Sequence, residues 1–146
     1  MPGRRPTEED LRAFAFLADI TEADTAALLA ESEMLDVPAG ARVIEEGETD
    51  DRLFLLRSGT VSVVIEGEHR ARLVAPDIVG EIPATPVGHS FRRTASVTAD
   101  TDAVLIAIPS DTLRELESRN PALRDHVRAL RARRLSFDAL RRHLRP

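Results

Sequence analysis

The middle of the chain, residues 42–108, is broken by glycine turns at short intervals, and this pattern constrains the fold more than any other feature. Short runs rich in Val, Ile, Leu and Phe lie between turn signals such as Ser-Gly and Pro-Asp, which is typical of strands. Six strands are expected, over 42–44, 53–56, 61–65, 71–74, 94–99 and 103–108. Strands at this spacing predict an antiparallel sandwich or barrel, with Val61, Val63 and Ile65 facing one side.

Helix signals lie before this β segment. Thr7-Glu8-Glu9-Asp10 has the form of a capping box and predicts a helix over 11–18. Thr21-Glu22-Ala23-Asp24 repeats the signal and predicts a second helix over 25–34. The chain should therefore be mainly β with flanking helices.

Two further helices are expected after the strands. Ser110-Asp111 predicts a cap for a helix over 112–119, and Pro121 is a favourable first residue for a helix over 121–144. The last helix carries a stripe that repeats in a heptad-like pattern, made of Leu123, Val127, Leu130, Phe137 and Leu144. This stripe predicts a homodimer through the last helix. Arg134 and Arg141 occupy the remaining seam positions and argue against a continuous coiled coil, so packing of the helix on its own domain stays an alternative.

Charge is unevenly distributed along the 146 residues, whose net charge is −5. Residues 113–146 hold ten Arg and four acidic residues, a net charge of +6, which leaves −11 for the rest. These Arg residues form either a solvated helix face that pairs with the acidic body or a surface for nucleic acid. The absence of Tyr and Trp argues against a single-stranded nucleic-acid binder, which needs stacking platforms. All 20 basic residues are Arg, which indicates a GC-rich bacterial genome.

Several classes of protein are excluded or disfavoured. The chain has no Cys, no run of 18 apolar residues and no secretory signal, so we expect a cytoplasmic protein with a single domain and no membrane segment. The histidines show no metal-ligand spacing, and no nucleophile is paired with a base. We therefore expect no metal site, no cofactor and no catalytic residue.

Two sequence pieces carry a family resemblance. The first is Ile44-x-x-Gly47 followed by Leu53-Phe54-x-Leu56-x-x-Gly59-x-Val61. The second is Gly80-Glu81-Ile82 followed by Arg93-Thr94-Ala95-Ser96-Val97. Together they resemble the cyclic-nucleotide-binding domain family over about residues 10–140. The resemblance implies an antiparallel β-roll of the jelly-roll type over 37–109, with helices over 7–36 and 110–146 and a phosphate-binding cassette over 80–97.

The resemblance also implies the ligand contacts. Glu81 would accept a hydrogen bond from a ribose hydroxyl, and Gly80 would leave room for the sugar. Arg93 would bind the cyclic phosphate through its planar guanidinium, with Arg92 as a possible substitute. Thr94 would bond to the phosphate or a purine edge. The predicted ligand-binding set also includes Ile82, Ala95 and Asp138, the last aligned with a base-reading position on the final helix. A structural ion pair between Glu81 and Arg93 is the alternative.

The second piece departs from the family pattern. Pro83 stands where the family usually has Ala or Gly, and proline lacks the N–H that would face the phosphate. The segment from Glu81 to Arg93 is also about two or three residues longer than usual. The leading hypothesis is a sensor for cAMP or cGMP that signals to a protein partner through its C-terminal helices. The second is a degenerate domain that has lost its ligand and serves dimerisation or docking. A DNA-binding regulator is disfavoured because no helix-turn-helix follows.

Overall fold

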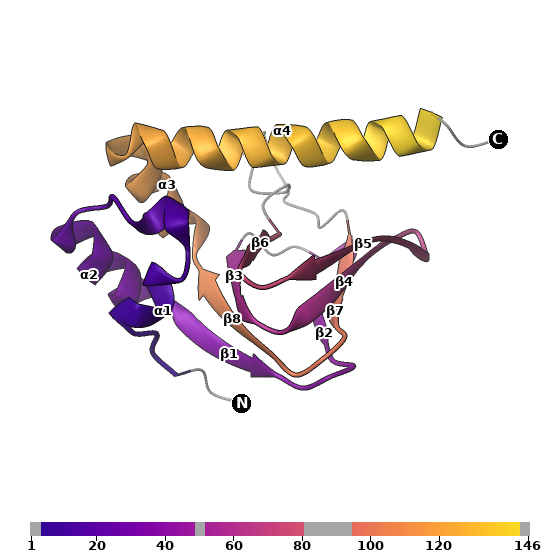
Figure 1. Ribbon diagram of the computed structural model, residues 1–146, viewed down its shortest axis with the longest axis horizontal. Helices are drawn as coiled ribbons and strands as arrows, with labels where there is room; N and C mark the ends of the chain where they lie inside the picture. Colours follow the sequence, from indigo (N-terminus) through magenta and orange to yellow (C-terminus); the bar gives the residue numbers. More distant parts are fainter. Residues whose placement is uncertain (1–3, 49–51, 81–94, 144–146) are drawn as a thin grey trace.

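The protein folds into a β-roll with helices at one end and one long helix across it (Figure 1). The computed structural model describes residues 4–48, 52–80 and 95–143, and for residues 131 and 134–143 it describes the backbone alone. The helices in these ranges are α1 (Glu8–Arg12), the 3-10 turn η1 (Ala15–Leu17), α2 (Glu22–Glu31), α3 (Ser110–Arg119) and α4 (Pro121–His143).

Two antiparallel sheets of four strands form the roll. One sheet has the order β1-β8-β3-β6 and the other β2-β7-β4-β5. The strands are β1 (Glu33–Val37), β2 (Arg42–Ile44), β3 (Leu53–Ser58), β4 (Thr60–Ile65), β5 (Glu68–Val74), β6 (Asp77–Val79), β7 (Ser96–Ala99) and β8 (Ala103–Ile108). This architecture confirms the predicted antiparallel β-roll with flanking helices.

The paired strands β3 and β8 separate two apolar cores. Leu53 and Leu55 of β3 join a cluster with the helices, whereas Phe54 and Leu56 join the cluster between the sheets. The residues of β8 alternate in the same way. Ile108, which pairs with Leu53, joins the cluster with the helices, and the next residue, Ala107, joins the cluster between the sheets. A strand buried on both faces reads as a continuous apolar run, which explains the sequence Leu-Phe-Leu-Leu. Full burial of such a side chain contributes roughly 1.5–3 kcal/mol.

The N-terminal caps form as predicted, but the helices after them are shorter. Thr7 and Asp10 make a reciprocal capping box. The helix expected over 11–18 is divided into α1 and η1. The side chain of Thr21 accepts a hydrogen bond from the backbone N–H of Asp24 and begins α2.

The prediction of helix to residue 34 is wrong, and the strand β1 was missed. The helix α2 ends at Glu31, and β1 pairs with β8 in the register Glu33↔Ala107. Met34 is buried beneath the helices, so pairing with an apolar edge of the sheet outweighs the helical pattern. The short strand β6 was also missed, and β5 begins three residues earlier than expected.

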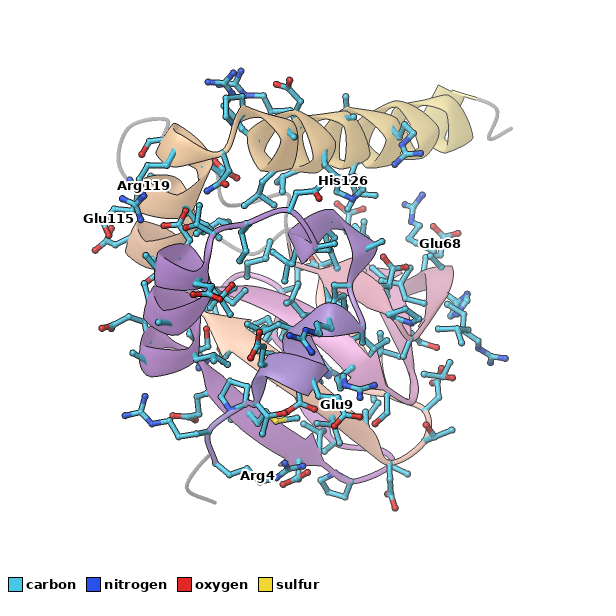
Figure 2. All side chains as sticks on the ribbon, turned by 60° about the vertical axis from the view of Figure 1, so that its left-hand side comes forward. Arg4, Glu9, Glu68, Glu115, Arg119 and His126 are labelled. Carbon is cyan, nitrogen blue, oxygen red and sulfur yellow. The ribbon has the colours of Figure 1, made fainter. Side chains whose placement is uncertain are left out.

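The C-terminal helices agree closely with prediction. The helix α3 begins at Ser110, with Pro109 in place of the expected Ser110-Asp111 at its cap. In α4, Leu123 and Val127 are buried against the helical core, and Leu130 packs on it. This part of the predicted stripe therefore packs on its own domain, which was the alternative to a dimer contact. The His126 ring stacks on Phe16 of η1 with centroids 4.9 Å apart (Figure 2). None of the helices in the described ranges is long and apolar enough to cross a membrane.

Gly59, between β3 and β4, gives a direct test of this fold. Its φ is +94°, and a Cβ built there would lie 2.5 Å from the backbone oxygen of Asp102. Left-handed strain and a clash with backbone should together make Gly59→Ala cost about 3 kcal/mol of unfolding free energy. Gly67→Ala is the control, since Gly67 also has positive φ but meets nothing within 4 Å, and should cost only about 1 kcal/mol. Equal costs in denaturant unfolding would contradict this packing.

Candidate functional site

The segment that carries the second motif joins the two sheets. The strand β6 ends at Val79, which pairs with Phe54 of β3 in one sheet. The strand β7 begins at Ser96, which pairs with Val64 of β4 in the other sheet. Residues 80–95 therefore start on one wall of the roll and finish on the other.

The structure describes two of the predicted ligand-binding residues at this place. Gly80 directly follows β6 with φ +81°, in the left-handed region that favours glycine. Ala95 directly precedes β7 and is half-buried. Gly80 and Ala95, two of the predicted ligand-binding residues, thus lie at the two ends of the segment that joins the sheets.

The other predicted contacts are not tested by the structure. Glu81, Ile82, Arg92, Arg93 and Thr94 lie outside the described residues. Pro83 lies there too. Asp138 lies within α4, where only the backbone is described. Their roles remain predictions.

The interior of the roll beside Gly80 and Ser96 is apolar. Phe54, Val61, Val79 and Val97 belong to the cluster between the sheets, and each is no more than 3% exposed. This apolar cluster offers dispersion contacts but no charge. Any charged contact at this end would therefore come from the segment itself or from the rim of the roll.

A buried cation at that rim was missed in the sequence. Arg70 lies on β5 with its side chain only 9% exposed, whereas the Arg72 side chain is 65% exposed. A register shift between Val63 and Val64 changes the alternation of β5 at this point. Such a shift depends on the pairing of two strands, so the periodicity of one strand does not reveal it.

The junction of α3 and α4 is fixed to α2 by a buried carboxylate. Asp24 is 6% exposed, and its Oδ1 accepts from Nε of Arg119 at 3.0 Å. Its Oδ2 accepts from Nδ2 of Asn120, also at 3.0 Å. The backbone carbonyl of Asn120 in turn accepts from the N–H of Arg124 in the first turn of α4. Asp24 therefore holds the corner from which α4 starts, and Arg119 is visible at that corner in Figure 2.

The hydrogen bonds to Asp24 change its acidity. The Asn120 amide and the Arg119 guanidinium hold the pKa of the Asp24 carboxyl below its ordinary value. A lowered pKa in the folded state means that the ionised carboxylate stabilises the fold above the pKa of the unfolded chain. This stabilisation is lost as pH falls through the lower pKa of the folded state.

Within the part of the chain that the structure describes, no group of three or more His, Asp or Glu side chains is arranged to hold a metal ion.

A family model for the cyclic nucleotide-binding domain matches residues 34–120, which include α3 and all but the first residue of the two sheets. The chain belongs to the cyclic-nucleotide-binding domain family. The family is regulatory rather than catalytic in general.

Individual relatives agree with this assignment. The Pycsar effector protein XpPycTIR of Xanthomonas perforans is 32% identical over 117 residues, which are 80% of this chain and 37% of that protein. The CRP-like cAMP-activated global transcriptional regulator of Mycobacterium tuberculosis is 31% identical over 115 residues, 75% of this chain and 50% of that protein. The matched part of the chain thus spans half or less of the length of each of these relatives.

A solved structure shows the same fold. The catabolite activator protein of Thermus thermophilus superposes with a TM-score of 0.70 at 24% identity, over 90% of this chain and 62% of that one. The β-roll with its flanking helices is therefore shared with part of a longer protein.

The corner held by Asp24 can be tested through its pH dependence. Asp24→Asn should lower the melting temperature at pH 7, because the variant leaves Arg119 without its ionised partner. The difference from wild type should shrink as pH falls below about 4, where the unfolded carboxyl becomes protonated.

Asp19→Asn is the control, since Asp19 is exposed. It should change the melting temperature by no more than about 2 °C. A difference between wild type and Asp24→Asn that stays constant from pH 7 to the acidic range would contradict the assigned interaction.

Proposed function

We propose that this domain is a non-catalytic receptor for a cyclic nucleotide, cAMP or cGMP in the first instance. The observation that carries the proposal is the position of the Gly80–Ala95 segment, which joins the two sheets of a family β-roll and bears the matched motif residues. In this proposal Arg93 binds the phosphate and Glu81 the ribose. The M. tuberculosis relative is named as cAMP-activated, which supports a nucleotide ligand.

The response to ligand would pass through the C-terminal helices. The start of α4 is fixed by Asp24, Arg119 and Asn120, and its first turns pack on the helical core. A nucleotide bound beneath α4 would change the populations of helix positions by its differential affinity for them. The XpPycTIR relative is named an effector protein, which supports relay to another domain or protein.

A second candidate is a domain that keeps the fold without the ligand and serves as a dimerisation or docking module. Pro83 and the length of the segment favour it, because a missing N–H removes one hydrogen bond to a charged phosphate, worth about 1.5–3 kcal/mol. Nucleotide binding separates the two candidates.

Substitutions at the two arginines test the receptor directly. Arg93→Ala should abolish binding of the cyclic nucleotide in calorimetry with little change in melting temperature, because the planar donor pair for the phosphate is lost. Arg93→Lys should also bind poorly, since a point charge cannot reproduce two parallel hydrogen bonds. Arg92→Ala is the matched control and should bind more tightly than Arg93→Ala. Equal behaviour of the two alanine variants, or no binding by wild type at millimolar nucleotide, would reject the assignment.

Pro83→Ala tests the departure from the family pattern. The variant restores a backbone N–H, and we expect affinity for the nucleotide to rise roughly tenfold, which corresponds to about 1.4 kcal/mol. Unchanged affinity in calorimetry would mean that residue 83 does not face the phosphate.

We also propose a homodimer through α4. Sedimentation should give twice the mass of one chain, and Phe137→Asp should give the monomer, because an added charge opposes burial of the apolar stripe. Ala132→Asp, at an exposed position outside the stripe, should leave the dimer intact. A wild-type monomer at high micromolar concentration would contradict the dimer.

A further inference from the structure

The break between α3 and α4 has the local sequence of a hinge. Asn120 leaves the helical conformation, with φ −129° and ψ 83°, and Pro121 begins the next helix. Proline disfavours the helical conformation in the residue before it, so the two helices cannot run on as one. A short non-helical link of this kind is where two helices can turn relative to one another. In this chain, contacts on both sides of the link oppose such a turn.

Asp24 of α2 holds the link through both of its carboxylate oxygens. Oδ1 accepts from Nε of Arg119 at 3.0 Å, with Nη2 of the same guanidinium 2.8 Å away. Oδ2 accepts from Nδ2 of Asn120 at 3.0 Å, and the same amide nitrogen donates to the backbone carbonyl of Leu116 at 2.7 Å. A buried carboxylate that loses its donors is strongly unfavourable. Turning α4 at Asn120 would therefore disturb a contact that Asp24 cannot easily lose.

A second anchor lies in the second turn of α4. The imidazole of His126 stacks on the ring of Phe16 in η1, with 4.9 Å between the centroids and 10° between the planes. Phe16 in turn meets the buried Phe14 edge-on at 6.1 Å. Ring pairs favour particular relative orientations, so this contact restrains the rotation of α4 about its own axis. Figure 2 shows His126 between α4 and the N-terminal helices.

The inner face of α4 near these anchors is buried. Leu123 is 2% exposed and Val127 1%, and both belong to the cluster that contains Leu28 of α2 and Leu116 of α3. Leu130 packs at the edge of the same cluster. The start of α4, over residues 121–130, thus has apolar, aromatic and ionic restraints that come from three different elements.

We propose that residues 121–130 stay with α2, α3 and η1 as one body, and that any change in the position of α4 begins beyond Leu130. In this arrangement Asp24 is the positioning residue that prevents a turn at Asn120, and it acts through Arg119 and Asn120. The inference rests on the proposed receptor function only for the signal that would move the helix. The anchoring itself belongs to the chain without ligand.

Distances between two spin labels test this inference, because the chain has no Cys and a pair of Cys can be introduced where needed. Ala26 of α2 and Ala129 of α4 are exposed and suit such a pair. In the otherwise wild-type chain, the distance between them should be narrowly distributed and should not change when cGMP or cAMP is added. Arg119→Gln removes the charged partner of Asp24. The population of a second distance should then rise roughly tenfold, from about 1% to about 10%.

Arg114→Gln is the matched control. Arg114 lies on the same helix with a similar side-chain exposure, 48% against 51% for Arg119, but its carboxylate partner Asp111 is 95% exposed. This variant should keep the narrow distribution. Asp24→Asn removes the same ionic contact from the other side, should give the same second distance as Arg119→Gln, and serves if that variant does not fold.

A distance between Ala26 and Ala129 that changes when the nucleotide binds to the otherwise wild-type chain would overturn the inference. A distribution that stays narrow in both Arg119→Gln and Asp24→Asn would overturn it as well. If neither nucleotide binds at millimolar concentration in calorimetry, the receptor function is wrong, and the two variants still decide whether Asp24 anchors α4.

Discussion

The antiparallel pair of β3 and β8 is the constraint on which the rest of the structure depends. Both strands are apolar on both faces, so each needs a hydrophobic layer on either side. The helices α1, α2 and α3 and the start of α4 supply one layer through Leu28, Leu113 and Leu123. The second sheet supplies the other through Val61 and Val97. Because the pair is satisfied only by both layers, the roll and the helices form one cooperative unit.

This arrangement determines where the candidate segment begins and ends. Gly80 follows a strand of the sheet of β3, and Ala95 precedes a strand of the sheet of β4, so the segment between them connects the two sheets. The helix α4 starts at a corner that Asp24 fixes and runs across the roll (Figure 1). In the proposed function, a ligand held at this segment would act on α4, whose start is anchored to α2 and to the helical core.

Much of this architecture could be predicted from local sequence. The run Leu53-Phe54-Leu55-Leu56 and the caps at Thr7 and Thr21 report interactions within a few residues, and the structure confirms them. The strand β1 could not be predicted, and its first two residues fit the end of a helix, because its pairing partner, β8, lies about 70 residues away.

Contacts between distant residues could not be predicted at all. Arg119 meets Asp24 across a separation of 95 residues. The burial of Arg70 depends on a register shift that exists only once β4 and β5 are paired. Composition suggested only that the arginines are solvated or face an anion. It did not show which arginine has which role.

The most direct test of the account is an NMR titration that follows backbone amides as cGMP is added to saturation. The account predicts that the largest shifts fall on Gly80, Ala95 and Ser96, at the two ends of the motif segment. The opposite end of the fold, where Arg4 pairs with Asp36, should stay unchanged. A spectrum that does not respond to millimolar cGMP or cAMP, or shifts confined to residues away from the junction of the sheets, would contradict the claim that this end of the roll binds a cyclic nucleotide.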